Sequence, residues 1–246
     1  MSSESNQEMI VCIPGPWKSR SGFVVGLAEE LDGEFIFAGK MLYHPDTSDY
    51  IDLEFEEMSV NLHEAFSYAG QGRISEKVLD QVEGHQGVVY LHFPFNYTNE
   101  RERIANFTRA IQKCGGYAIK IESTGVAHEW DRWFELVKSD DIIDAYCACV
   151  VLVGGDSGSI YSYGMHHFGL PETEVVAKEI DVDEAIDTIN EFNVYQLVDE
   201  TDLDSGHTFS VNEDAAIFQV SKVEDERHEK QDLFHNPNGI WRLERT

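Results

Sequence analysis

Residues 87–121 read GVVYLHFPFNYTNERERIANFTRAIQKCGGYAIKI, and the expected fold class follows from this stretch. The run Gly87–Phe93 is apolar and rich in β-branched and aromatic side chains, which is typical of a buried strand. Apolar residues then recur at helical spacing from 100 to 114, with Asn99 as the expected N-cap and two glycines as the stop. Residues 117–121 return as a second strand. This order predicts a βαβ element, or half of a ferredoxin-like fold.

The segments on either side predict further elements of both kinds. We expect helices over 62–70, 75–82, 129–138 and 181–192, a buried strand over 147–153, and hairpins at 22–27/34–38 and 208–211/216–220. We therefore predict an α+β fold with a mixed sheet and packed helices in a single compact domain. Residues 1–9 are expected to be a flexible tail and 10–246 the domain. A subdivision near 176 would separate an acidic C-terminal part, 177–246.

The charge of the chain excludes several classes of partner. Its 246 residues contain 46 acidic and 18 basic residues, a formal net charge of −28. Nucleic acids and anionic membrane surfaces both require clustered lysine and arginine, so we expect neither as a partner. A strongly anionic protein attracts basic proteins instead. Residues 171–226 hold 17 acids and two bases. This is either a solvated face or a docking face for a basic protein.

The expected compartment is the cytoplasm. The N-terminal residues are polar and acidic and lack the pattern of a secretory leader. No apolar run approaches the roughly 20 residues that cross a bilayer. The four cysteines are expected to be reduced thiols.

Four side chains are the candidates for chemistry: His85, His128, His166 and Glu172. If they met in a pocket, they could serve a small-molecule hydrolase. A metal site that combines one of these histidines with a carboxylate is a further alternative. Since no His-Glu-x-x-His pattern, Walker loop or dinucleotide fingerprint is present, we predict no metal, no cofactor and no catalytic residue with a set role.

The segment YSYGMHHFGLPE at 161–172 reads as a motif. It resembles a segment of the type Leu-Gly-Leu-x-x-Phe-Gly-x-x-Glu in an uncharacterised bacterial family, domain of unknown function 4261. Gly164, Phe168, Gly169 and Glu172 would match it. His85, just before an apolar strand, and residues 123–127 are similar to that family as well. The resemblance would cover about 11–176 and implies an α+β fold without an established reaction. The alternative for 161–172 is a tightly packed turn.

These observations support a main functional hypothesis and two alternatives. The main one is an acidic cytosolic protein-binding module, in its most specific form an immunity or antitoxin protein that inhibits a basic bacterial toxin domain. The alternatives are the hydrolase and a non-catalytic, stress-associated scaffold; an enzyme is the less favoured outcome. The expected contacts of an inhibitor are Asp199, Glu200, Asp202, Asp204, Glu213 and Asp214.

Overall fold

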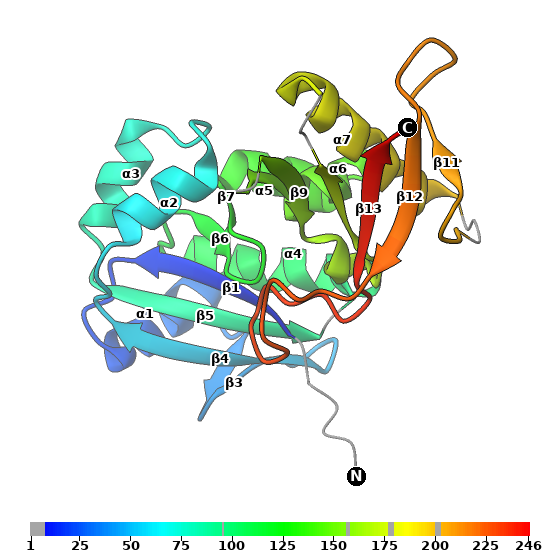
Figure 1. The fold of residues 1–246 in the computed structure, drawn as a ribbon. Helices are drawn as coiled ribbons and strands as arrows, with labels where there is room; N and C mark the ends of the chain where they lie inside the picture. Colours follow the sequence, from blue (N-terminus) through cyan, green and yellow to red (C-terminus); the bar gives the residue numbers. More distant parts are fainter. Residues whose placement is uncertain (1–7, 95, 156–157, 177–179, 200–202) are drawn as a thin grey trace. The chain divides into compact units, whose positions relative to one another are not determined.

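The predicted βαβ element is present in split form. Strands β5 (Gly87–Pro94) and β6 (Ile119–Ile121) run parallel, because each pairs antiparallel with β1 (Glu8–Gly15), which lies between them. Helix α4 (Tyr97–Lys113) connects β5 to β6 (Figure 1). The helix begins three residues earlier than expected, because the side chain of Asn96 and not Asn99 is the cap. The Asn96 side chain accepts a hydrogen bond from the amide of Asn99 at 3.2 Å.

The computed structural model describes residues 8–94, 96–155, 158–176, 180–199 and 203–246. These residues form two compact units that meet in sequence at Ser139 and Asp140. Helices and two sheets together confirm the α+β class, and the single domain stays a prediction. Strand β1 begins at Glu8, so Glu8 and Met9 belong to a strand and not to the predicted tail.

The unit before residue 140 is a seven-stranded sheet with helices on both faces. Its order is β2-β3-β4-β5-β1-β6-β7, with β2 (Ile36–Ala38), β3 (Met41–His44), β4 (Asp49–Glu57) and β7 (Val126–His128). Side chains alternate along β1, so Val11 and Ile13 face α4 and α1 (Arg20–Leu31), while Cys12 faces α2 (Leu62–Gly70) and α3 (Glu76–Glu83). Helix α5 (Trp130–Lys138) packs on α4, where the Trp133 indole N–H donates to the Thr108 hydroxyl at 3.0 Å.

Helix α1 replaces a predicted hairpin strand. Phe23, Leu27 and Leu31 are spaced by four residues and are all buried, which is a helical pattern. The Ser19 hydroxyl caps the helix by accepting from the amide of Gly22 at 3.2 Å. The sequence prediction was wrong because the glycines and adjacent valines of this stretch favour strands and turns more than helices.

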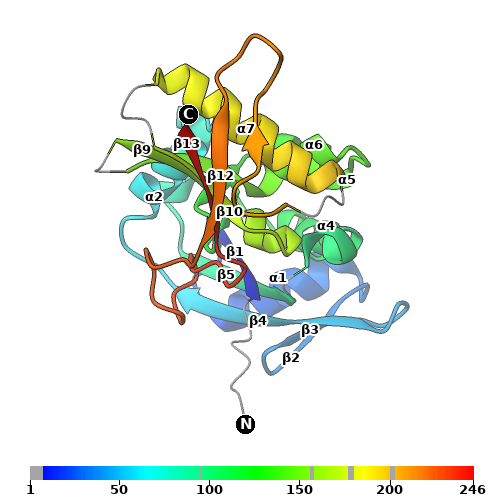
Figure 2. The same cartoon turned by 45° about the vertical axis from the view of Figure 1, so that its right-hand side comes forward.

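The unit from residue 140 on is a second sheet packed on α7 (Val182–Val198), as Figure 2 shows. The strand order is β11-β12-β13-β10-β9-β8, with β8 (Val151–Gly154), β9 (Ser159–Tyr163), β10 (Glu172–Val176), β11 (Thr208–Phe209), β12 (Phe218–Val223) and β13 (Ile240–Arg245). Its core contains Val175, Ile189, Phe192, Phe218 and Leu243. The predicted terminal hairpin is confirmed, since β11 and β12 pair antiparallel.

Helix α6 (Ile142–Cys149) contradicts the predicted strand over 147–153. Asp141 caps it by accepting from the amide of Ile143 at 2.9 Å, and only β8, from Val151 on, is strand. An eight-residue helix followed directly by a strand forms one continuous apolar run, which periodicity does not divide. All four cysteines are free thiols.

Candidate functional site

The motif at 161–172 is formed by β9, a single 3-10 turn (Met165–Phe168) and the start of β10. Gly164 begins the turn with φ of 122°, and a Cβ there would lie 2.2 Å from the carbonyl oxygen of Cys149. Both facts require glycine at this position. Gly169 ends the turn with φ of 73° in open space. Phe168 is half-buried within the turn.

The turn is organised around the carboxylate of Glu172, whose side chain has no exposed area. Oε1 accepts from the amides of Gly164 and His166 at 3.1 and 3.2 Å, and His166 Nδ1 lies 2.9 Å from it. Oε2 accepts from the Ser162 hydroxyl at 2.7 Å and from the amide of Met165 at 3.2 Å. A buried carboxylate that accepts this many hydrogen bonds stabilises the backbone conformation of the turn strongly.

Residue Asn236 completes this cluster from a distant part of the chain. Its side-chain amide donates to Glu172 Oε1 at 3.1 Å and to the carbonyl of Leu170 at 2.9 Å. The segment before β13 is thereby fixed to the motif. Ser162 and Asn236 were not among the predicted site residues, because neither residue type in isolation indicates a partner.

The surroundings of Glu172 favour its ionised form. Burial alone would raise the pKa of the Glu172 carboxyl, but the hydrogen bond and charge of His166, the Ser162 hydroxyl and the Gly164 amide lower this pKa. The surroundings of the adjacent His167 favour its neutral form instead. Burial and the neighbouring His166 lower the pKa of His167 well below 6.5, so its ring is neutral near pH 7.

This buried cluster has no access for a substrate in the described structure. His166, His167 and Glu172 all have 0% exposure, and catalysis requires contact between side chain and reacting atom. The arrangement therefore holds backbone segments together. This agrees with the alternative of a tightly packed turn.

The other two candidate histidines have structural contacts within the unit before residue 140. His85 Nδ1 lies 2.6 Å from the carbonyl of Val82, and its Nε2 accepts from the amide of Ser59 at 3.1 Å. His128 is buried against the Trp133 ring, with centroids 5.9 Å apart. Of the four candidates for chemistry, the structure brings His166 and Glu172 into contact.

Four of the six predicted partner contacts are exposed. They are Asp199, at the end of α7, Asp204, in the loop before β11, and Glu213 and Asp214, in the loop between β11 and β12. Glu200 and Asp202 lie outside the described residues. The β11–β12 loop extends beyond the sheet in Figure 2.

Helix α7 carries further exposed acids that the sequence prediction did not include. Asp183, Asp187 and Glu191 recur every four residues on its solvent-exposed side. The opposite side of α7 packs on β11, with the rings of Phe192 and Phe209 4.9 Å apart. We call these seven exposed residues the α7–β11 acidic surface: Asp183, Asp187, Glu191, Asp199, Asp204, Glu213 and Asp214.

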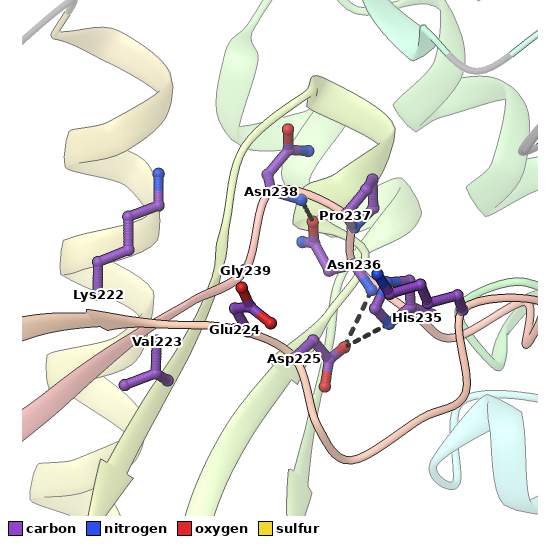
Figure 3. A pocket seen from close by; sticks show the side chains of 10 residues that line it. Lys222, Val223, Glu224, Asp225, His235, Asn236, Pro237, Asn238 and Gly239 are labelled. Carbon is purple, nitrogen blue, oxygen red and sulfur yellow. Dashed lines mark hydrogen bonds and ion pairs between the residues drawn. The ribbon is translucent and has the colours of Figure 1, made fainter. Parts of the chain in front are cut away.

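A pocket of about 530 Å³ lies beside the segment that Asn236 fixes (Figure 3). Its lining consists of residues 222–225, Lys230 and 235–239. Asp225 forms part of its wall and accepts from the amide of Asn236 at 3.0 Å. A second pocket, of about 510 Å³, shares Val223 and Glu224 with the first and includes Arg227 and Arg242.

Two other kinds of feature are absent from the part of the chain that the structure describes. No group of three or more His, Cys, Asp or Glu side chains there could hold a metal ion. No helix among those residues has the length and apolar character to cross a membrane.

Residues 161–244 match the family model of a domain of unknown function, DUF4261. The predicted resemblance is confirmed. The match begins at the motif around Glu172 and continues through Asn236, so the DUF4261 segment overlaps the expected range of 11–176 only at its start. It includes both pockets and all seven residues of the α7–β11 acidic surface, but not His85 or 123–127. No curated protein and no solved structure matches the chain.

Proposed function

We propose that the chain is a cytoplasmic, acidic protein-binding module whose partner is a basic protein. Its most specific form is an immunity- or antitoxin-type inhibitor of a basic toxin domain. The observation that carries this proposal is the α7–β11 acidic surface, seven exposed carboxylates along one helix and the loops beside the strand it packs on. No lysine or arginine occurs from 180 to 221, so this stretch of sequence is strongly negative.

Three of these acids, Asp187, Glu191 and Asp199, occupy positions that do not favour the stability of α7. Like charges four residues apart destabilise a helix by a few tenths of a kcal/mol, and Asp187 and Glu191 have this spacing. Asp199 follows the last turn of the helix, where the macrodipole disfavours a carboxylate. Because these acids lower the stability of the helix, a role in folding does not explain them, and this supports a role in binding.

Such a surface suits a partner that itself binds phosphates. A basic toxin domain such as a nuclease presents lysine and arginine to its substrate, and carboxylates of an inhibitor can occupy the same positions. Complementary charge also increases the association rate, up to 10⁸–10⁹ M⁻¹s⁻¹ at low salt in favourable cases.

The hydrolase alternative receives less support from the described residues. Its histidine and carboxylate, His166 and Glu172, are enclosed on all sides, and His85 bonds to backbone groups. The scaffold alternative can be distinguished from our proposal by experiment. It requires no dedicated basic partner, whereas our proposal does.

The test begins with purification of the tagged protein from its host at low salt and identification of co-eluting proteins. The association rate of a captured basic protein is then measured against salt for the variant Asp187→Asn/Glu191→Gln/Asp199→Asn. A matched control, Glu29→Gln/Glu30→Gln/Glu64→Gln, neutralises three exposed acids in the other unit.

We expect the α7 variant to associate at least about tenfold more slowly and with a smaller salt dependence, while the control remains near wild type. Equal loss in both variants would mean that net charge alone attracts the captured protein. Recovery of the protein without a basic partner would contradict the proposal and favour the scaffold.

A further inference from the structure

The pocket of about 530 Å³ has the size of a small-molecule site. All of its lining lies between residues 222 and 239, within the DUF4261 segment and within one unit. Figure 3 shows Lys222 and His235 on opposite sides of the pocket, with the carboxylate of Glu224 between them. The pocket is therefore polar and has charged groups on more than one side.

The wall of the pocket is fixed by buried hydrogen bonds. The Asp225 side chain has no exposed area and accepts from the amides of Asn236 and Arg227 at 3.0 and 3.1 Å. Asn236 is 1% exposed, and its side chain bonds to Glu172. Gly239 has φ of 82° and lies so close to the Val223 carbonyl that a Cβ would approach it to 2.5 Å. A wall held in this way needs little ordering when a ligand binds.

The basic residues of this unit gather at the two adjoining pockets. Its described lysines and arginines are Lys222, Arg227, Lys230, Arg242 and Arg245, and the first four line one pocket or the other. The three arginines form ion pairs, with Asp225, Glu174 and Glu184. Among the described residues, neither Lys222 nor Lys230 forms an ion pair, and both line the first pocket.

The charged groups that line this pocket balance, Lys222 and Lys230 against Glu224 and Asp225, although the chain is strongly negative. Asp225 is compensated by Arg227, which leaves two lysines against Glu224. Lysine binds carboxylate and phosphate groups as a mobile point charge with three donors.

We propose that this pocket binds a small molecule through an oxyanion group, a carboxylate or a phosphate, held by Lys222 and Lys230. The site shares no residue with the α7–β11 acidic surface, although the Lys222 amide donates to the hydroxyl of Ser205 beside Asp204, and it does not depend on the proposed function. The remaining groups of the ligand would contact the fixed wall formed by Asn236, Asn238 and Gly239.

The test is calorimetric titration of the whole chain with glutarate and with inorganic phosphate, at constant ionic strength. The variants are Lys222→Gln/Lys230→Gln and Lys230→Gln alone. The matched control is Arg245→Gln, which removes one positive charge from the same unit outside both pockets. Thermal unfolding confirms that each variant is folded. If the double variant does not fold, the comparison is made with Lys230→Gln alone.

We expect saturable binding of at least one anion, about tenfold weaker in the double variant and weaker in Lys230→Gln, with Arg245→Gln near wild type. Binding of glutarate alone would identify a carboxylate ligand, and binding of phosphate alone a phosphate ligand. Absence of saturable binding by both anions would overturn the proposal. So would binding that Arg245→Gln weakens as much as the lysine variants do.

Discussion

The side-chain amide of Asn236 donates a hydrogen bond to the carboxylate of Glu172 at 3.1 Å, across 64 residues of sequence. The bond joins the first residue of β10 to the segment that precedes β13, and these two strands pair in parallel from Glu172 and Ile240 onward. A fully buried charge at this junction makes the polar cluster sensitive to any change in its donors or acceptor.

Replacing Glu172 by Gln should destabilise the protein strongly. Glutamine keeps the shape but places an amide N–H₂ among donors, so buried N–H groups lose their acceptor. We expect the free energy of unfolding to fall by about 3 kcal/mol. Chemical denaturation measures this change.

The matched control is Glu174→Gln on the same strand. Glu174 pairs with Arg242 at 3.0 Å, and the Arg242 side chain is 40% exposed. An ion pair with such access to water contributes about 0–1 kcal/mol. An equal decrease in the free energy of unfolding for the two variants would show that Glu172 stabilises the fold no more than Glu174 does.

Two glycines of the same turn should differ in their tolerance of alanine. In Gly164→Ala the new methyl group meets the Cys149 carbonyl, so backbone must move, and we expect a loss of at least about 3 kcal/mol or failure to fold. Gly169→Ala meets no atom within 4 Å and carries only the cost of positive φ, about 1 kcal/mol. Thermal melts of both variants compare the two losses, and a milder effect at Gly164 would contradict this geometry.

The sequence predicted most elements whose periodicity is strong. The βαβ element at 87–121, α2, α3, α5, α7 and the β11–β12 hairpin follow from local spacing and stop signals. The error at α1 arose where residue propensity conflicts with packing, and the error at α6 arose where a helix and the next strand form one apolar run. In α1, burial of Phe23 and Leu27 outweighs two glycines, which is a tertiary effect that local sequence does not contain.

The candidate site was predictable only in part. The motif containing Gly164 and Glu172 could be recognised in the sequence, because its glycines and proline indicate a turn. The contact with Asn236 depends on how β10 and β13 pair, and no local pattern encodes a parallel pairing across so many residues. The exposed side of α7 was available from helical spacing, since Asp183, Asp187 and Glu191 recur every four residues.

The stability of the protein should decrease in mild acid because of His167. Its pKa in the folded protein lies well below 6.5, so below pH 6.5 the unfolded chain takes up a proton that the folded protein does not. This contribution is fully present above 6.5 and is lost as pH falls, with a slope of up to about 1.4 kcal/mol per pH unit.

The variant His167→Gln should show a shallower decrease between pH 7 and about 5, whatever its absolute stability. His207→Gln, in an exposed loop, is the matched control for the loss of one histidine. Denaturation at several pH values gives the slopes. Identical slopes for wild type and His167→Gln would contradict this assignment. The lowered pKa of Glu172 affects stability in a separate pH range, below the usual carboxyl value of 4.5, where stability is lost as pH falls.

Neutralising one acid of the α7–β11 acidic surface should stabilise the protein slightly. Glu191 lies four residues after Asp187 on α7, so Glu191→Gln removes a repulsion between like charges. We expect the free energy of unfolding to rise by about 0.2–0.5 kcal/mol at low salt and the gain to vanish at high salt. Glu100→Gln is the matched control, because Glu100 pairs with Arg103 at 2.6 Å on α4 and its removal should cost stability. A loss of stability in Glu191→Gln would mean that this carboxylate is structural, and it would weaken the argument that the acids of α7 are retained for binding.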